Sequence, residues 1–277
     1  SDFDRDAHWS FFDMGPWGSG HQHNDKLHLS VSAYGKDFLV DSGRFAYTGE
    51  VAEKFRPYAK SSAAHNLLLI DGKGQQNGPT MTDKPLDEDH FKIATNFDYA
   101  SSSFDQFMDL EGSVKHTRVV FYVRGQFWVV VDNIETDRPR RIDALWHWHP
   151  ENTVVKDRYT VKTLNERGNL TLVPVSRQNF DIQLIKGQET PEIQAWYSPE
   201  YNLYEPNTTS SYSCEIEGNF TLVWLLMPSD KESPNIKTKI ISENKDGITL
   251  GVSVKEKKWL LNIPFYESAD AAIEKSQ

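Results

Sequence analysis

The chain has 277 residues, a formal net charge of -10 and 12% aromatic residues. This length can bury a sizeable core, as one large all-β domain or two smaller ones. The excess of Asp and Glu over Lys and Arg, 40 against 30, argues against nonspecific nucleic-acid binding, which requires a basic surface. A single cysteine, Cys214, excludes an intrachain disulfide. No apolar run approaches the roughly 18 residues of a membrane span.

In chain order, the sequence predicts short strands separated by turn signals, with little helix. Glycine turns such as Arg124-Gly125-Gln126 separate apolar runs in the manner of a hairpin. The pattern predicts helices only at Glu50–Lys60 and Ala269–Lys275 and a surface loop at Asn77–Asp89. The predicted strands are Leu27–Tyr34, Asp37–Asp41, Asn66–Asp71, Val119–Val123, Phe127–Val131, Ile142–His149, Asn169–Val175, Asn219–Met227, Ile248–Val254 and Lys258–Pro264.

Many short strands with regular turns indicate an all-β fold of antiparallel sheets packed as a multi-stranded sandwich. We expect residues 1–277 to form one continuous sandwich; the alternative is a second lobe that begins near Glu151. Within Trp146-His147-Trp148-His149, alternation places the tryptophans on one face of a strand and the histidines on the other. We expect one of these faces to lie in the core.

The most informative segment follows a glycine-rich stretch at residues 15–20 and contains His21, His23 and Asp25. If this segment is extended, alternate side chains share a face. His21, His23 and Asp25 would then lie on the face that continues as Leu27 and Leu29, so both imidazoles would point toward the sandwich interior. Because this motif begins only 20 residues from the start, we expect further sequence to precede it.

Buried imidazoles need polar partners, and two further residues could supply them. Asp41 ends an apolar strand, and His65 directly precedes another. Two histidines and one aspartate with an open position would suit zinc. The other interpretations are ordinary hydrogen-bonded core histidines, a non-catalytic sugar-binding sandwich, and a cupin-like metal enzyme. A cupin requires a glutamate shortly after the second histidine, and none occurs before Glu50.

Three elements within residues 15–76 resemble the heparinase II/III-like domain. They are Gly20-His21-Gln22-His23-Asn24-Asp25, Val40-Asp41-Ser42-Gly43 and Ala64-His65-Asn66, in that order. Ser42 stands where the family often has proline. The family joins an N-terminal α/α toroid to a C-terminal antiparallel β-sandwich, so the resemblance implies that this chain is the sandwich without the toroid. It also implies metal-ligand roles for His23, Asp41 and His65, usually for zinc, and a catalytic role for His21.

The resemblance further implies a polysaccharide lyase that cleaves uronic-acid glycans by β-elimination. Such an enzyme neutralises the uronate carboxylate, removes the C5 proton and protonates O4, and His21 would serve as base or neutraliser. We expect the zinc to be structural and to orient His21. Arg44, Tyr47 and Tyr58 lie between two ligand elements and are predicted to bind substrate, Arg44 through a carboxylate.

The family's tyrosine acid and asparagine or histidine neutralisers come mostly from the toroid, which leaves the activity of this chain by itself open. The implied partners are an acidic polysaccharide and that toroid, and the implied location is periplasmic or secreted. The net charge of -10 favours a less sulfated uronate polymer over heparin.

Overall fold

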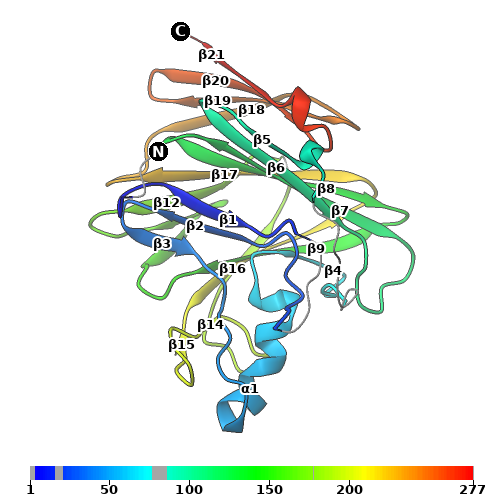
Figure 1. The fold of residues 1–277 in the computed structure, drawn as a ribbon, viewed down its shortest axis with the longest axis vertical. Coiled ribbons are helices and arrows are strands. Elements are labelled where there is room, and N and C mark those ends of the chain that lie inside the picture. The colour runs from blue at the N-terminus through cyan, green and yellow to red at the C-terminus, as the bar shows by residue number, and fades with distance from the viewer. Residues whose placement is uncertain (1–3, 16–20, 77–85, 177, 277) are drawn as a thin grey trace.

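The computed structural model describes residues 4–15, 21–76, 86–176 and 178–276, and it is built mainly from antiparallel strands (Figure 1). Two large sheets face each other across the main core, and a smaller C-terminal sheet covers the outer face of one of them. This arrangement confirms the predicted all-β antiparallel sandwich.

The first large sheet carries the segments that hold the candidate site. Its strand order is β1-β2-β3-β9-β16-β13, and β4 also pairs with β9. The bounds are β1 Trp9–Phe12, β2 Leu29–Ala33, β3 Lys36–Leu39, β4 Leu68–Ile70, β9 Arg140–Trp148, β13 Asp181–Lys186 and β16 Thr208–Ile216.

The second large sheet has the order β10-β11-β12-β17-β8-β7-β6-β5. Its central strands are apolar on both faces because both faces are covered. On β7, Val120 enters the core between the two large sheets, whereas Val119 and Phe121 enter the core beneath the C-terminal sheet. The bounds are β5 Phe91–Ile93, β6 Phe97–Phe104, β7 Val114–Val123, β8 Phe127–Thr136, β10 Val154–Asp157, β11 Thr160–Thr163, β12 Asn169–Pro174 and β17 Phe220–Ser229.

The C-terminal sheet runs in sequence order and corrects one prediction. It comprises β18 Ile236–Asn244, β19 Gly247–Val254, β20 Lys257–Pro264 and β21 Ala272–Ser276. The predicted helix Ala269–Lys275 is wrong, because this segment forms a short 3-10 helix, Ser268–Asp270, followed by β21, which pairs with β20. Pairing with an existing strand overrides the helix propensity of alanine, glutamate and lysine. A separate two-stranded ribbon joins β14 Trp196–Tyr197 to β15 Glu205–Pro206.

The single α-helix among the described residues, α1 Gly49–Lys60, confirms the predicted helix Glu50–Lys60. Phe55 and Tyr58 on its buried face pack with Phe45 and Ala64 in a small cluster separate from the two larger cores. The helix ends at Lys60 and is capped by Ser61, and a 3-10 turn, Ser62–Ala64, leads directly to His65. A further 3-10 turn spans Glu88–His90, at the end of the predicted surface loop, of which residues 77–85 lie outside the described part.

The segment around the histidine motif differs from the extended strand that was predicted. Residues 21–28 form a loop, and β2 begins at Leu29 rather than Leu27. The positive φ angles of His21 (34°) and Leu27 (77°) break the alternation on which that prediction relied. On β9, both tryptophans of the predicted alternation are buried in the main core, and His147 on the other face is buried as well.

Candidate metal centre

Four side chains from three separate segments converge at one point beside α1. His23, Asp25, Asp41 and His65 each offer a ligand atom, and these atoms lie within 4.8 Å of one another. The structure thus brings together the predicted trio of His23, Asp41 and His65 and adds Asp25. Two imidazole nitrogens and two carboxylate oxygens form a donor set that suits zinc.

His65 is the buried centre of this group. Its Nδ1 donates a hydrogen bond to the carbonyl of Ser61 at 2.8 Å, which directs Nε2 toward the two carboxylates. Nε2 lies 3.0 Å from Asp41 Oδ2 and 3.6 Å from Asp25 Oδ2. Burial alone would lower the pKa of His65, but the negative charges of Asp41 and Asp25 raise it to about 9. The pocket therefore favours a cation at this nitrogen.

Two buried atoms in the group make no hydrogen bond of good geometry, namely Asp25 Oδ1 and His65 Nε2, and the close contacts of His65 Nε2 are its ion pairs with Asp41 and Asp25. Buried polar atoms almost always have a hydrogen-bond partner, so one without such a partner indicates strain or a missing ligand such as a metal ion. Both atoms belong to the four-residue group and both are of the type that coordinates zinc. The residues present therefore fit a metal ion held by His23, Asp25, Asp41 and His65.

Asp41 owes its orientation to the turn that follows β3. Its Oδ1 accepts a hydrogen bond from the backbone N–H of Gly43 at 2.6 Å, which leaves Oδ2 to face His65. Gly43 has a φ of 83°, and a Cβ at this position would lie 2.8 Å from the carbonyl oxygen of Ser198. Glycine is thus required here both for its conformation and for the close approach of another backbone segment.

The end of α1 holds the loop that carries His23 and Asp25. The N–H of Asn24 donates to the carbonyl of Lys60 at 2.9 Å, and the hydroxyl of Ser62 donates to the carbonyl of Asn24 at 2.7 Å. The ring of His23 lies 5.5 Å from that of His65. One helix end therefore fixes His65 and the His23 loop relative to each other.

The buried side chain of Asn66 connects backbone segments that lie next to the ligands. Its side-chain amide donates to the carbonyls of Leu29 at 2.8 Å and Val40 at 3.2 Å, and its oxygen accepts from the N–H of His147 at 2.6 Å. Its own N–H donates to His28 Nδ1 at 3.1 Å. Because Val40 directly precedes Asp41, and His65 precedes Asn66, this asparagine fixes two ligands at once.

His21 lies next to the group but faces outward. It is exposed, which corrects the expectation that it points into the sandwich, and its Nδ1 lies 2.9 Å from the hydroxyl of Tyr47. The guanidinium of Arg44 lies 5.4 Å from the centre of the Tyr47 ring and 5.1 Å from that of Tyr201. The guanidinium of Arg56 lies 4.9 Å from the same Tyr47 ring. His21, Arg44 and Tyr47 therefore share one exposed surface.

Tyr58, the third predicted substrate-binding residue, has a different place. It is buried among the residues under α1, and its hydroxyl lies 3.3 Å from that of Ser42. Burial raises its pKa to about 12. In this position Tyr58 supports the turn that carries Asp41 and Gly43.

Sequence reasoning did not assign site roles to Asp25, Arg56 and Tyr201. The sequence could have indicated Asp25, since it belongs to the same short motif as His23. Arg56 lies on the predicted helix, but nothing in the helical pattern indicates that it reaches Tyr47. Tyr201 lies 154 residues beyond Tyr47, to whose N–H its hydroxyl is bonded at 3.4 Å, and no local signal links the two.

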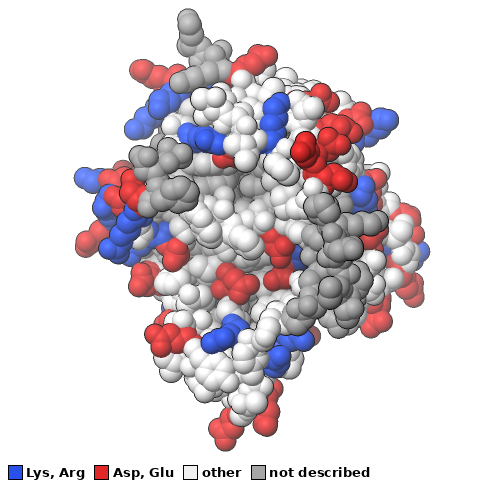
Figure 2. Space-filling model, in the orientation of Figure 1, with Lys and Arg blue, Asp and Glu red and all other residues white. Residues whose placement is uncertain are grey.

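The surface around the site carries both charges. In the view of Figure 2, Asp and Glu side chains occupy the middle of the face, and Lys and Arg side chains lie below them, in the region where Figure 1 shows α1. Further acidic side chains lie beside and below these basic ones, and α1 carries Glu50 and Glu53 as well as Lys54, Arg56 and Lys60, so the surface near α1 is mixed in charge.

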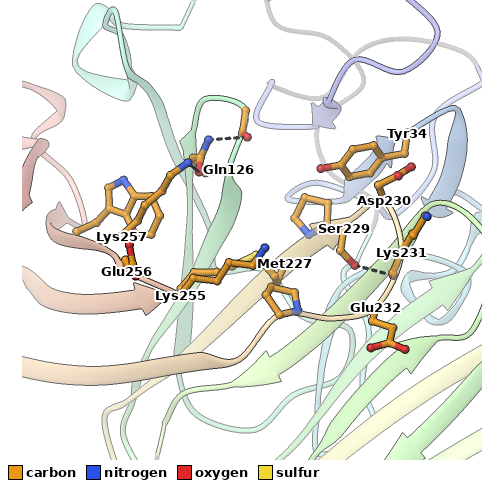
Figure 3. A pocket seen from close by; sticks show the side chains of 15 residues that line it. Tyr34, Gln126, Met227, Ser229, Asp230, Lys231, Glu232, Lys255, Glu256 and Lys257 are labelled. Atoms are coloured by element: carbon orange, nitrogen blue, oxygen red, sulfur yellow. Dashed lines mark hydrogen bonds between the residues drawn. The ribbon is translucent and has the colours of Figure 1, made fainter.

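A separate cavity of about 780 Å³ lies where the C-terminal sheet meets the second large sheet (Figure 3). Its walls include Tyr34, Gln126, Lys255 and Lys257, and the ammonium group of Lys257 is bonded to the side-chain oxygen of Gln126 at 3.4 Å. None of the predicted site residues lines this cavity, so it is distinct from the metal centre.

Comparison with known proteins extends the match found in the motifs. A family model described as "Heparinase II/III-like, C-terminal" matches residues 3–241. A heparin-sulfate lyase of Bacteroides stercoris is 21% identical over 262 residues, which are 90% of this chain and 36% of that protein. A heparin-sulfate lyase of Pedobacter heparinus is 20% identical over 277 residues, 95% of this chain and 39% of that protein. The chain thus spans less than half the length of either relative.

Solved structures share the fold. A crystal structure of a heparan sulfate lyase mutant from Pedobacter heparinus matches with a TM-score of 0.80 at 18% identity, covering 96% of this chain and 41% of that one. The structure of a heparinase III gene product matches with a TM-score of 0.75 at 19% identity, covering all of this chain and 40% of that one. Within the described residues, no helix is long and apolar enough to cross a membrane.

Proposed function

Because the chain belongs to the Heparinase II/III-like, C-terminal family, we propose that it is the β-sandwich part of a polysaccharide lyase that cleaves uronic-acid glycans by β-elimination. We also propose that residues 1–277 act as one domain and that an α/α toroid completes the enzyme. The length of the matched relatives, which extends well beyond this chain, supports the second proposal. Family membership also removes the cupin-like hypothesis.

One observation supports this proposal: the ligand atoms of His23, Asp25, Asp41 and His65 converge, and buried Asp25 Oδ1 makes no hydrogen bond. These residues would hold a zinc ion. When bound, the ion would supply a fixed link among the three segments, and its role would be structural. His21, two residues before His23, would thereby be held at the surface that faces the substrate.

His21 and Tyr47 would carry the proton transfers that this chain contributes. If the Tyr47 hydroxyl donates a hydrogen bond to His21 Nδ1, then Nε2 carries the ring proton and can stabilise the charge of the uronate carboxylate by a hydrogen bond. If Nδ1 donates to Tyr47, then Nε2 is unprotonated and can remove the C5 proton. The single 2.9 Å contact between these groups is compatible with both roles of His21.

Arg44 would bind the uronate carboxylate from the same surface. Its guanidinium is held over Tyr47 and Tyr201, and a planar guanidinium pairs well with a carboxylate. Tyr58 would contribute by supporting the turn after β3. The substrate would be an acidic polysaccharide, less sulfated than heparin, and a protein that acts on such a polymer would be periplasmic or secreted.

The first test is the metal content of the purified chain. We expect about one zinc per chain in the wild type, loss of that zinc in His23→Ala, and its retention in His90→Ala, which changes a histidine outside the group. A wild-type chain that contains no metal and takes up none when zinc is added would refute the site.

The second test requires the full-length protein that contains this chain. Elimination is followed by the ultraviolet absorbance of the unsaturated uronate product. We expect His21→Ala to retain zinc and to lose activity by at least 100-fold, the usual range for loss of a general acid or base. Full activity in His21→Ala would exclude His21 from catalysis. Metal binding without elimination of any uronate polymer would instead favour a non-catalytic sugar-binding sandwich.

A further inference from the structure

A buried group of charged residues lies in the core between the two large sheets. One of its members, Arg118, is also bonded to the segments that carry the metal-site residues. His116 and Arg118 on β7 and Asp132 on β8 are each no more than 1% exposed. Arg118 Nε donates to Asp132 Oδ1 at 2.7 Å and Nη2 donates to Oδ2 at 3.1 Å, while His116 Nε2 lies 2.7 Å from Oδ1. Trp224 donates its indole N–H to Oδ2 at 2.9 Å. The Asp132 carboxylate is therefore fully engaged.

Such a group is a poor source of stability by itself. Removing charges from water is costly, and well-packed apolar residues often serve equally well or better in their place. The bonds of Nη1, the one side-chain nitrogen of Arg118 that does not contact Asp132, suggest another role for this group. Arg118 Nη1 donates to the carbonyl of Leu27 at 2.9 Å and to that of Asn66 at 2.5 Å.

These two carbonyls belong to the two segments that carry most of the ligands. Leu27 follows Asp25 by two residues and has a φ of 77°, so its carbonyl direction depends on an uncommon backbone conformation. Asn66 directly follows His65. One guanidinium nitrogen thus holds the His23 loop and the His65 segment in a fixed relation, while Asp132 fixes the guanidinium itself.

We propose that Arg118 is a positioning residue for the metal centre, and that it sets the affinity for zinc by holding both ligand segments in their binding geometry. This inference rests on the proposed zinc site. A lysine would preserve the charge opposite Asp132, but it has a single ammonium group and lacks the rigid fork that reaches the carboxylate and both carbonyls together. Partners that orient metal ligands typically contribute 10- to 100-fold in metal affinity.

The test compares Arg118→Lys with Trp224→Phe. The second variant also removes a hydrogen bond to Asp132, but the indole N–H that it removes bonds neither the Leu27 nor the Asn66 carbonyl, so it controls for general loss of core stability. The zinc dissociation constant is measured by competition with a chromophoric chelator, and unfolding is measured in urea. We expect Arg118→Lys to weaken zinc binding by about 10- to 100-fold, and Trp224→Phe to lower the unfolding midpoint while leaving zinc affinity within about threefold.

Hydrogen exchange of the metal-free proteins provides a readout that does not depend on zinc. We expect Arg118→Lys to lose protection selectively in peptides covering residues 21–31 and 61–70, and Trp224→Phe not to do so. Equal effects of both variants on zinc affinity and exchange, or no effect of Arg118→Lys on either, would overturn the proposal. If the wild type binds no zinc, the proposed function fails, and the exchange pattern alone then decides whether Arg118 positions these segments.

Discussion

Replacement of Asn66 by alanine gives a direct measure of how strongly the site is built into the fold. The Asn66 side chain is fully buried and serves three backbone groups: the carbonyls of Leu29 and Val40 and the N–H of His147. Each buried backbone group that loses its partner costs about 1–3 kcal/mol. The loss of all three partners therefore predicts a decrease of roughly 3–9 kcal/mol in the free energy of unfolding.

The measurement is urea unfolding in the presence of a chelator, followed by tryptophan fluorescence, with the denaturant slope compared between variants. Asn244→Ala is the matched control. Asn244 also accepts two backbone hydrogen bonds, from Asp246 and Gly247, but it is exposed, so water replaces it and we expect a loss below about 1 kcal/mol. A loss below about 1 kcal/mol in Asn66→Ala as well would refute the reasoning.

Two further predictions concern pH and glycine. Burial lowers the pKa of both His28 and His147 to about 3, whereas the unfolded chain titrates near pH 6.5. Their stabilisation is therefore complete above about pH 6.5 and falls by several kcal/mol as the pH drops toward 3. Urea unfolding between pH 8 and pH 4 should show this decline and a shallower slope in His147→Gln; a flat profile would contradict it. Gly43→Ala should destabilise by about 1–3 kcal/mol, because its φ is positive and its Cβ would meet the Ser198 carbonyl. Gly125→Ala, whose φ is also positive but whose Cβ meets nothing within 4 Å, should lose less; equal losses would show that the close contact plays no part.

Local patterns were sufficient to predict about half of the strands among the described residues, and they missed others such as β6 and β16. Alternation and apolar runs mark a strand wherever one or both faces of a sheet are buried, and β7, β8, β9 and β17 are buried strands of this kind. The same local information drew attention to the histidine motif, to Asp41 and to His65, whereas the resemblance to the family's three motifs selected His23, Asp41 and His65 as the ligands. The local inferences use only the residue and its near neighbours in the chain.

The C-terminal tail shows where local patterns fail. Ala269–Lys275 has helix-forming residues, but its backbone completes the edge of the C-terminal sheet by pairing with β20. The strand's hydrogen-bond partners lie outside its own sequence, so its local propensity does not include the interaction that decides its structure.

The site itself was decided by tertiary structure in two respects. The loop at residues 21–28 replaces the predicted strand because the end of α1 and Arg118 hold its backbone, and this turns His21 outward while Asp25 joins His23. The sequence by itself determined which residue types were available for a metal ion and for proton transfer. Their relative positions depend on contacts between segments 37 to 91 residues apart, such as those of Asn66 and Arg118, and only the folded chain brings these segments within hydrogen-bond distance.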